Sequence, residues 1–499
     1  MKASTYTEKI NIPSVDDFSS RYPQYAPFAL ADGRGLFEKL MSPKALIMAR
    51  AATEMNLPAV QGIADLCNDE FSSAIKIHAK KFISQFVGAV VCLLMEANGY
   101  ARSGKKKSVN HCNFSKSEFY VPAKTLDQLS LERDFIENLI QWSPDKKAHQ
   151  GEIQVIDFFC GCGGMSLGFA ASGKFKMLGG VDIKEDAVKT YEQNIGVHGY
   201  QQDIVKLYEE EGLLEEFLKK IKYDRSRPSV VIGCAPCQGF SAHRKKNKGP
   251  DDRRNSLVGI FASIATEISP DCIVIENVPE LLSEKYSSYF QEAKKTFEDH
   301  HYIVNTTVVN AAEFGVPQAR CRALIIAMKH PFSMPKPLYG QSEFRTVRDA
   351  IGKLPPVEVG AVDPNDKLHR CANHRKTTID TIRMIPHDGG SRPNGIGPKC
   401  LDEVSGFYDV YGRLFWEKPS ITITHYARNP ASGRFVHPEQ DRGLTLREMA
   451  CLQSFPLDFD FSGSFDSIAE QIGEAVPPVL SAAVAGSVLW DMENKDFQQ

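Results

Sequence analysis

The stretch that decides the fold is VIDFFCGCGG at residues 155–164, where a short apolar run leads directly into closely spaced glycines. Such a run, bounded by glycines, is typical of a strand buried in a parallel sheet. Glycines in the turn that follows let the backbone approach a ligand at the carboxyl end of the strand. No Lys-Ser or Lys-Thr pair follows them, and this argues against a loop that grips phosphate groups. A Gly-rich turn alone leaves dinucleotide and ATP binding open as competing interpretations.

Residues 150 to 330 repeat this pattern, since short apolar runs alternate with amphipathic stretches. The expected strands are Val155–Phe159, Met177–Val181, Val230–Gly233, Cys272–Ile275 and Ala323–Ala327. The expected helices are Lys184–Asn194, Glu209–Lys222, Ser256–Ile268 and Ser287–Glu298. Alternation of this kind predicts an α/β fold with a doubly wound, mostly parallel sheet.

Acidic residues follow two of the expected strands. Asp182 ends the second strand, where a carboxylate suits hydrogen bonding to ribose hydroxyls, although it could equally be an acid at a helix N-terminus. Asp203 and Ile204 follow a third short strand and could hold an adenine amino group and ring face. Together with the glycine turn, these residues indicate a nucleoside-type cofactor.

The fourth strand ends in a segment with two cysteines, Cys234 and Cys237. Their spacing is that of redox or zinc sites, but a closed zinc site needs two further ligands. Cys160 and Cys162 could supply them only by distorting the cofactor turn, and we expect both to be small packing residues. The other interpretation is a single catalytic thiolate, Cys237, because a thiolate is a strong nucleophile.

The fifth strand and the segment after it add charged groups to the same edge of the sheet. Glu276 follows the apolar run 273–275, which weakens the interpretation of a plain surface acid. Arg320 and Arg322 precede a further strand, and side chains at i and i+2 share one face of a strand. Facing a pocket, the two arginines could grip a carbonyl or orient the acid; facing solvent, they would be ordinary.

Bulk composition sets outer limits. The chain has 499 residues and a net charge of −3, so a nucleic-acid surface would have to be local. The 12 cysteines are scattered and residues 1–16 are polar, which favours reduced thiols and a cytoplasmic location. The longest strongly apolar run, Phe86–Met95, is too short to span a bilayer, so we expect no membrane partner.

Residues 1–148 are expected to form a mainly helical N-terminal extension. Short helices are expected at Ala45–Asn56 and Pro58–Asn68, and a long one at Phe71–Asn98. The basic turn Arg102–Lys107 and the strand Glu118–Val121 follow. A winged-helix-like DNA-binding unit and a helical cap with a solvated lysine turn explain this pattern equally well.

Six stretches together resemble the cytosine-5 DNA methyltransferase family in their order and approximate spacing. They are Asp157–Phe169, Gly233–Ser241, Glu276–Pro279, Gln318–Arg322, Leu444–Phe455 and Gln471–Pro478. The resemblance covers residues 152 to about 490, and its combination of Pro-Cys-Gln, Glu-Asn-Val and Gln-x-Arg-x-Arg is very specific. It implies a Rossmann-like domain that binds S-adenosyl-L-methionine at 149–330, a smaller, irregular target-recognition domain at 331–450, and a return to the catalytic domain at 451–499.

The resemblance also implies a mechanism. Cys237 would attack C6 of a cytosine flipped out of duplex DNA, so that C5 becomes nucleophilic and takes the methyl group. Glu276 resembles the family carboxylate that contacts N3 and the N4 amino group, and it would act only when protonated or sharing a proton. Arg322 and Arg320 resemble the arginines that contact O2 and order the site.

Ligand-binding residues carry over by position. Those expected at the cofactor are Phe159, Gly161, Gly164, Asp182, Ile183, Asp203, Ile204 and Pro236. Those expected at DNA are Gln238, Ser241, Arg244, Lys245, Lys246, Arg253, Thr424 and Arg434. Half of the latter lie in the basic segment 243–255, which resembles the mobile loop of the family and would otherwise be a solvated charged loop. Arg434 could reach a base edge, since Arg suits guanine.

One residue departs from the family pattern, and one cluster has residue types that can bind a metal. The closing motif of the family has Asn where this chain has Glu474, and an acidic side chain near the cofactor carboxylate would be unfavourable. His369, Cys371 and His374 lie close together in the sequence, but without a clear fourth ligand we expect no metal site.

Double-stranded DNA is the expected partner, bound by a monomer whose N-terminal extension adds contacts to DNA or protein. The compact chain suggests a bacterial or phage-like source, with a restriction-modification or orphan role. One alternative is a tRNA cytosine-5 methyltransferase, but the Cys-Phe-Thr run usual in that branch is absent. The other is a DNA-binding regulator that acts through residues 1–148.

Overall fold

The computed structural model forms two compact units, Met1–Ser130 and Leu131–Gln499, which we describe separately. The residues that it describes are 12–23, 25–31, 34–42, 45–46, 86–87, 89–91, 93–95, 100–102, 120–142, 151–236, 257–284, 286–403 and 409–494. The division falls within helix α8 (Ala123–Ile140), earlier in the chain than the expected boundary at residue 148. The reason is that Phe135, Ile136 and Leu139 of this helix are buried in the second unit.

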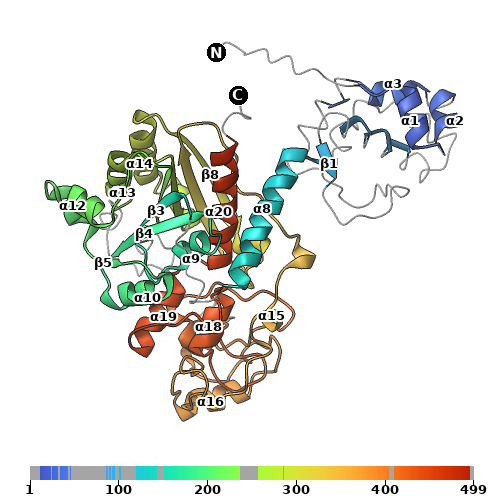
Figure 1. Ribbon diagram of the computed structural model, residues 1–499. Coiled ribbons are helices and arrows are strands. Elements are labelled where there is room, and N and C mark those ends of the chain that lie inside the picture. The colour runs from blue at the N-terminus through green and yellow to red at the C-terminus, as the bar shows by residue number, and fades with distance from the viewer. Residues whose placement is uncertain are drawn as a thin grey trace. The chain divides into compact units, whose positions relative to one another are not determined.

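A seven-stranded sheet organises the second unit, with the strand order β5-β4-β3-β6-β7-β9-β8 (Figure 1). The strands are β3 (Ile153–Phe158), β4 (Phe175–Asp182), β5 (Gly199–Gln201), β6 (Ser229–Gly233), β7 (Cys272–Asn277), β8 (Ile303–Asn310) and β9 (Cys321–Met328). Strands β3 to β7 pair in parallel, whereas β9 pairs antiparallel with both β7 and β8. The prediction of a doubly wound, mostly parallel sheet is confirmed.

The strand order places a switch point between β3 and β6. From β3 the chain proceeds outward to β4 and β5, and it then returns to pair β6 with the other side of β3. Crossovers therefore leave the ends of β3 and β6 in opposite directions, which opens a crevice where ligands bind in folds of this kind. The Gly-rich turn follows β3, and the segment that leads to Cys237 follows β6.

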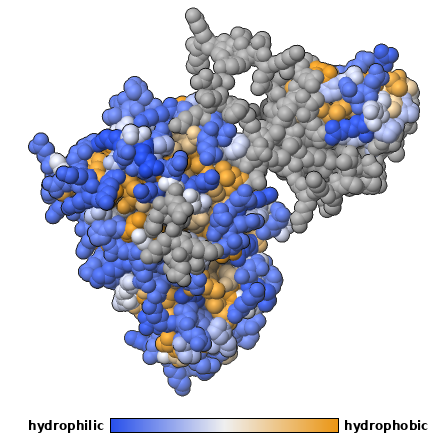
Figure 2. All heavy atoms as spheres, in the orientation of Figure 1, coloured by the Kyte–Doolittle hydropathy of each residue, from blue (hydrophilic) through white to orange (hydrophobic). Residues whose placement is uncertain are grey.

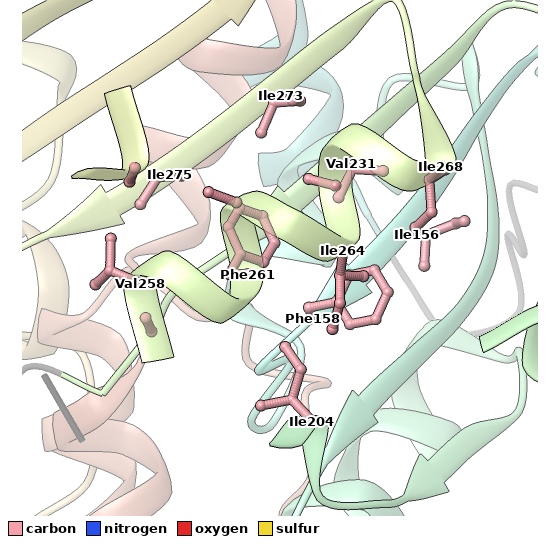
Figure 3. Close-up of a cluster of buried hydrophobic side chains, with 14 of the residues drawn as sticks. Ile156, Phe158, Ile204, Val231, Val258, Phe261, Ile264, Ile268, Ile273 and Ile275 are labelled. Atoms are coloured by element: carbon pink, nitrogen blue, oxygen red, sulfur yellow. The ribbon is translucent and has the colours of Figure 1, made fainter. Parts of the chain in front are cut away.

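Helices cover both faces of the sheet. One layer comprises α11 (Ile204–Glu209), α12 (Leu213–Lys220), α13 (Leu257–Ile268) and α14 (Ser287–Asp299), whose apolar faces form one buried cluster with the sheet. Figure 3 shows Val258, Phe261 and Ile264 of α13 among the side chains of β3 and β6. Burial of these apolar side chains is the main source of stability for the layer.

The opposite layer is built around α9 (Gly164–Ala170) and α20 (Pro478–Glu493), which pack against each other. Helix α20 begins at Pro478, a favoured first helical residue, as expected from the sequence. Among the described residues, Phe465–Glu493 is the one helical stretch that is long and apolar enough to cross a membrane, but 94% of its apolar window is buried. A buried core helix has these properties, and Figure 2 shows mainly hydrophilic residues on the coloured surface.

The remaining helices of this unit lie at the edge of the sheet and in the segments that follow it. They are α10 (Glu185–Ile195), η4 (Pro279–Leu282), η5 (Ala311–Phe314), α18 (Leu446–Leu452) and α19 (Phe465–Glu474).

Residues 331–445 have little regular structure, as expected, and their described part contains isolated bridges and short helices. The helices are η6 (Gln341–Glu343), α15 (Val347–Ile351), α16 (Lys376–Arg383), α17 (Cys400–Glu403), η7 (His425–Arg428) and η8 (Pro430–Ser432). Arg413 is fully buried and donates hydrogen bonds to the backbone oxygens of Ile382, Ile385, His437 and Gln440. This segment is therefore held together largely by buried guanidinium groups, which satisfy carbonyls that a sheet would otherwise pair.

The first unit contains α1 (Val15–Arg21), α2 (Ala26–Leu30), α3 (Arg34–Leu40) and the antiparallel pair β1 (Tyr100–Arg102) and β2 (Tyr120–Pro122). Its described core includes Phe18, Leu40, Phe86 and Leu94. The expected helices 45–56 and 58–68 and the basic turn after Arg102 lie almost entirely outside the described residues. Both interpretations of this unit, winged helix and helical cap, stay predictions.

The packing of α9 on α20 gives a stability prediction. A Cβ at Gly168 would lie 2.5 Å from the Ala482 backbone nitrogen, whereas one at Gly259 in α13 would have no atom nearer than 3.8 Å. We expect Gly168→Ala to destabilise the fold by about 1–3 kcal/mol, because backbone must move. Gly259→Ala, the matched control, should be neutral or stabilising by up to about 1 kcal/mol. Urea midpoints measure both, and equal effects would contradict the packing.

Candidate active site

The turn after β3 leaves open space above one of its glycines. Phe159, Gly161 and Gly163 have positive φ angles of 59°, 51° and 94°, which bend the chain sharply from β3 into α9. A Cβ at Gly161 would meet nothing within 4 Å, whereas one at Gly164 would collide with the backbone oxygen of Val476. Gly164 is thus needed for packing of the closing segment, while Gly161 borders free space where a ligand can approach the backbone.

Asp182 joins the end of β4 to this turn. Its two carboxylate oxygens accept hydrogen bonds of 2.9 Å from the backbone N–H groups of Gly161 and Lys184. Burial raises the pKa of Asp182, and these hydrogen bonds oppose that rise. The next residue, Ile183, is 63% exposed. A carboxylate beside an exposed apolar side chain and an open glycine turn fits a nucleoside, which has both hydroxyls and a flat apolar ring.

The other expected cofactor residues lie after the ends of β3, β5 and β6. Asp203 caps α11 by accepting a hydrogen bond of 2.9 Å from Val205 N, and Ile204 is buried in the core cluster. Phe159 packs against that cluster, and Pro236 is the last described residue after β6. Contact of these four residues with a cofactor stays a prediction.

Asp157 is a further acidic residue near the turn, and no role was predicted for it from the sequence. It is buried in β3 and accepts a hydrogen bond of 2.5 Å from Ser166 Oγ, while its Oδ1 has no hydrogen-bond partner. Burial raises its pKa to about 8, so this carboxyl is largely neutral at pH 7. The signal in the sequence was an acid inside an apolar strand run.

The cysteines near the turn differ from the proposed nucleophile. Cys160 and Cys162 are buried, and burial raises the pKa of both thiols, that of Cys162 to about 12. They therefore stay protonated and serve as packing residues, as expected. Cys234 is half-buried, with its sulfur 3.3 Å from that of Met165. Cys237 lies outside the described residues.

Glu276 and Arg322 lie together at the edge of the sheet next to β6. Glu276 is 7% exposed, and its Oε1 is 2.8 Å from Nε of Arg322. The antiparallel pairing of β7 with β9 brings the two residues together, because Asn277 is opposite Ala323. A nearly buried carboxyl paired with a guanidinium can present a polar edge to a heterocyclic base.

Asn277 connects this pair to the nucleophile segment. Its side-chain amide donates a hydrogen bond of 3.1 Å to the backbone oxygen of Ala235, and its Oδ1 accepts one of 2.8 Å from Val278 N. The end of β7 is thereby tied to the chain two residues before Cys237. No role of Asn277 was predicted from the sequence, although its position next to Glu276 is a signal for a role in the site.

Arg320 differs from Arg322 in its surroundings, and its contact with a substrate stays a prediction. Arg320 precedes β9 and is buried, and its guanidinium donates to the backbone oxygens of Ile423, Gly473 and Ala475 at 3.1–3.4 Å. These acceptors come from the target-recognition segment and the closing segment. In the structure, Arg320 therefore joins distant parts of the chain.

Gln318 extends this connection. Its side-chain amide donates to the backbone oxygen of Leu452 and to Oε1 of Gln453, while its own oxygen accepts a hydrogen bond of 2.8 Å from Ile423 N. Gln453 in turn donates to the backbone oxygen of Ile472 at 2.7 Å. Both glutamines are fully buried, so this network needs all of its partners.

The closing segment carries Glu474 next to the cofactor turn. The Glu474 carboxylate lies 2.7 Å from Nζ of Lys184, which is also 3.0 Å from Glu470. The unfavourable charge expected at this position is therefore compensated by a lysine from the far side of the turn.

Most expected DNA contacts lie outside the described residues, namely Gln238, Ser241, Arg244, Lys245, Lys246 and Arg253. Thr424 is half-buried and caps η7 through Tyr426 N. Arg434 has internal partners in the structure, and its contact with a base stays a prediction. It is 9% exposed, and its three guanidinium nitrogens donate to Asp409, Ser391 and nearby backbone oxygens. These internal bonds engage the group that would have to reach DNA.

The His369–His374 cluster is engaged in ordinary hydrogen bonds. The His369 ring contacts Thr445 Oγ1 at 3.0 Å and the Pro355 oxygen at 2.7 Å, and His374 Nε2 accepts from Gly443 N at 3.2 Å. Across the part of the chain that the structure describes, no three His, Cys, Asp or Glu side chains are grouped to hold a metal ion.

These features define an α/β fold with an open glycine turn beside the switch point of its sheet and a second polar site next to it. The family model of the C-5 cytosine-specific DNA methylase matches residues 153–490, and the chain belongs to this family. Its activity is thus the methylation of cytosine at C5 in DNA.

Curated relatives match the same region. The Type II methyltransferase M1.HphI of Haemophilus parahaemolyticus is 37% identical, over 67% of this chain and 86% of that protein. The Type II methylase M.HgiDII of Herpetosiphon aurantiacus is 34% identical, over 67% of this chain and 94% of that protein. A solved structure of a candidate DNA modification methyltransferase encoded within an E. coli prophage has a TM-score of 0.53 and 24% identity, over 68% of this chain and all of that one. It supports the fold.

The buried acid of β3 predicts a pH dependence of stability. Because the pKa of Asp157 is raised to about 8, its contribution to stability is fully present below the unfolded value of 3.8 and is lost as pH rises through about 8. We expect a loss of up to about 1.4 kcal/mol per pH unit in this window. Asp157→Asn should flatten the profile, as measured by urea unfolding at pH 5.5 and 7.5. Parallel profiles for the two proteins would contradict the assignment.

Arg320 and Glu276 should differ in what their substitution changes. Arg320→Met should lower the free energy of unfolding by about 2–4 kcal/mol, because buried carbonyls lose their donors. Glu276→Gln keeps the shape and an acceptor for Arg322, so the protein should stay folded while methyl transfer falls by about 10²–10³-fold. Urea unfolding and initial rates of methylation measure the two effects. A stable Arg320→Met protein with little activity, together with an unstable Glu276→Gln protein, would contradict both assignments.

Proposed function

We propose that the protein is a DNA (cytosine-5-)-methyltransferase that uses S-adenosyl-L-methionine and a covalent adduct between Cys237 and C6 of a flipped cytosine. The observation that carries the proposal is the Glu276–Arg322 pair. The hydrogen bond from the Asn277 side chain to the Ala235 oxygen holds this pair beside the chain that leads to Cys237. When bound, the cofactor supplies an electrophilic methyl group on a sulfonium. The open turn at Gly161, with Asp182 and the exposed Ile183, would hold its nucleoside part.

The chain's own residues would activate the base. Cytosine C5 is a poor nucleophile, but attack of the Cys237 thiolate on C6 breaks the C5–C6 double bond and moves its electrons toward C5. Negative charge that develops on the ring is offset by Glu276 at N3 and N4, if this carboxyl is protonated or shares a proton, and by Arg322 at O2. After C5 takes the methyl group, loss of the C5 proton to a base restores the double bond and expels Cys237.

Target selection would belong to residues 331–450, with Thr424 near phosphate, and the basic segment 243–255 would close over DNA. The base must leave the stack, which costs a few kcal/mol. Bacterial relatives whose names are those of Type II methyltransferases support a restriction-modification role and a cytoplasmic location. We further propose that one chain acts on one duplex site, with residues 1–148 adding DNA or protein contacts.

The experiment that tests this proposal is transfer of labelled methyl groups from S-adenosyl-L-methionine to duplex DNA. We expect label in 5-methylcytosine, and background levels with Cys237→Ser, because the hydroxyl is a far weaker nucleophile at neutral pH. A tRNA pool and Cys234→Ser, the neighbouring cysteine, are the controls. Label in tRNA alone would contradict DNA as the substrate, and full activity of Cys237→Ser would contradict the nucleophile.

A further inference from the structure

The Lys184–Glu474 ion pair spans the cofactor turn, although its members are distant in the sequence. Lys184 follows β4 directly, and its backbone N–H donates to Asp182, the carboxylate that also binds Gly161 N. Glu474 is the last residue of α19, and the next residue, Ala475, has its Cβ 3.3 Å from the position that a Cβ on Gly164 would take. The pair therefore joins the two segments that border the turn.

Further contacts hold α19 in the same place. Ser467 Oγ donates a hydrogen bond of 2.7 Å to Asp186 of α10, and the Cys162 thiol is 3.6 Å from the backbone oxygen of Gln471. The position of Glu474 beside the turn is thus fixed by several contacts besides the ion pair. These contacts hold the backbone of α19, so we expect Glu474 to stay near the turn when its partner is removed.

The charge of Glu474 reaches the cofactor turn. Burial raises the pKa of the Cys162 thiol to about 12 and also raises that of Asp182, and the Glu474 charge adds to both increases. Burial alone would lower the pKa of Lys184, but the Glu474 and Glu470 carboxylates raise it overall. Glu470 and Glu474 thus share one lysine, whose backbone N–H binds Asp182.

We propose that Lys184 and Glu474 are specificity-determining residues that set how strongly this site prefers its cationic cofactor over the neutral product of the reaction. The inference rests on the proposed function, because it concerns S-adenosyl-L-methionine and S-adenosyl-L-homocysteine. The two molecules differ by one methyl group and by the positive charge of the sulfonium. An acid beside the turn favours the sulfonium, and Lys184 moderates this preference by compensating that acid.

The test measures binding rather than turnover. Calorimetry without DNA gives the Kd of each of the two molecules, and the ratio of product Kd to cofactor Kd reports the preference. Lys184→Met leaves both glutamates uncompensated and should raise this ratio by about 3- to 10-fold. Glu474→Gln should lower it by a similar factor. Both shifts should shrink at 0.5 M salt, since the pair is partly exposed.

Two further variants separate a charge effect from a loss of structure. Lys184→Glu combined with Glu474→Lys restores opposite charges and should return the ratio toward that of the unchanged protein. Lys189→Met removes another lysine that pairs with an acid, Glu185, on α10, and should leave the ratio unchanged. An unfolded variant would weaken the binding of both molecules equally.

The outcomes distinguish this inference from the function on which it rests. Binding of both molecules with a ratio that no variant changes would overturn the inference and leave the proposed function intact. Shifts of Lys184→Met and Glu474→Gln in the same direction would also overturn it. If the unchanged protein bound neither molecule, the proposed cofactor and the inference would fail together.

Discussion

The buried guanidinium of Arg320 is the interaction on which the arrangement of the site depends. Its donors reach the backbone oxygens of Ile423, Gly473 and Ala475, so one side chain joins the entry to β9, the target-recognition segment and the closing segment. Carbonyls in irregular segments cannot pair with one another as in a sheet, and a buried carbonyl without a donor is costly. A planar group with several donors resolves this problem at the junction.

Around this junction, each acidic group has its own form of compensation. Asp157 is protonated through burial, Asp182 accepts backbone N–H groups, Glu276 faces Arg322, and Glu474 faces Lys184. The differences follow from depth, because a fully buried carboxylate without a cation is more stable in its neutral form. The carboxyl groups thereby serve as a packing group, a turn clamp, a partner of Arg322 and a surface charge.

Most strands of the sheet and the glycine turn could be predicted because their signals are local, whereas the order of the strands comes only from the complete fold. Apolar runs and glycines determine these elements within a few residues. The roles of Arg320 and Arg434 could not, because the carbonyls that they satisfy belong to segments brought close only by the complete fold. The sequence alone does not distinguish an arginine that faces a substrate from one that faces the protein interior. Lys184 and Glu474, 290 positions apart, were hidden for the same reason.

Strand order then explains why the chemistry of the two ligands stays separate but adjacent. Strand β3 carries the cofactor turn, with Asp182 from β4 on its outer side, while β6 and β7 lead to the cysteine segment and to Glu276. With the proposed function, the switch point would divide the carboxyl edge of the sheet into a cofactor half and a base half. The hydrogen bond from the Asn277 side chain to the Ala235 oxygen fixes the distance between the end of β7 and the cysteine segment in the base half. The closing segment packs against the glycine turn in the cofactor half. Methyl transfer needs a fixed distance between the two halves. A single continuous sheet maintains this distance, because its strands cannot shift without breaking their hydrogen bonds.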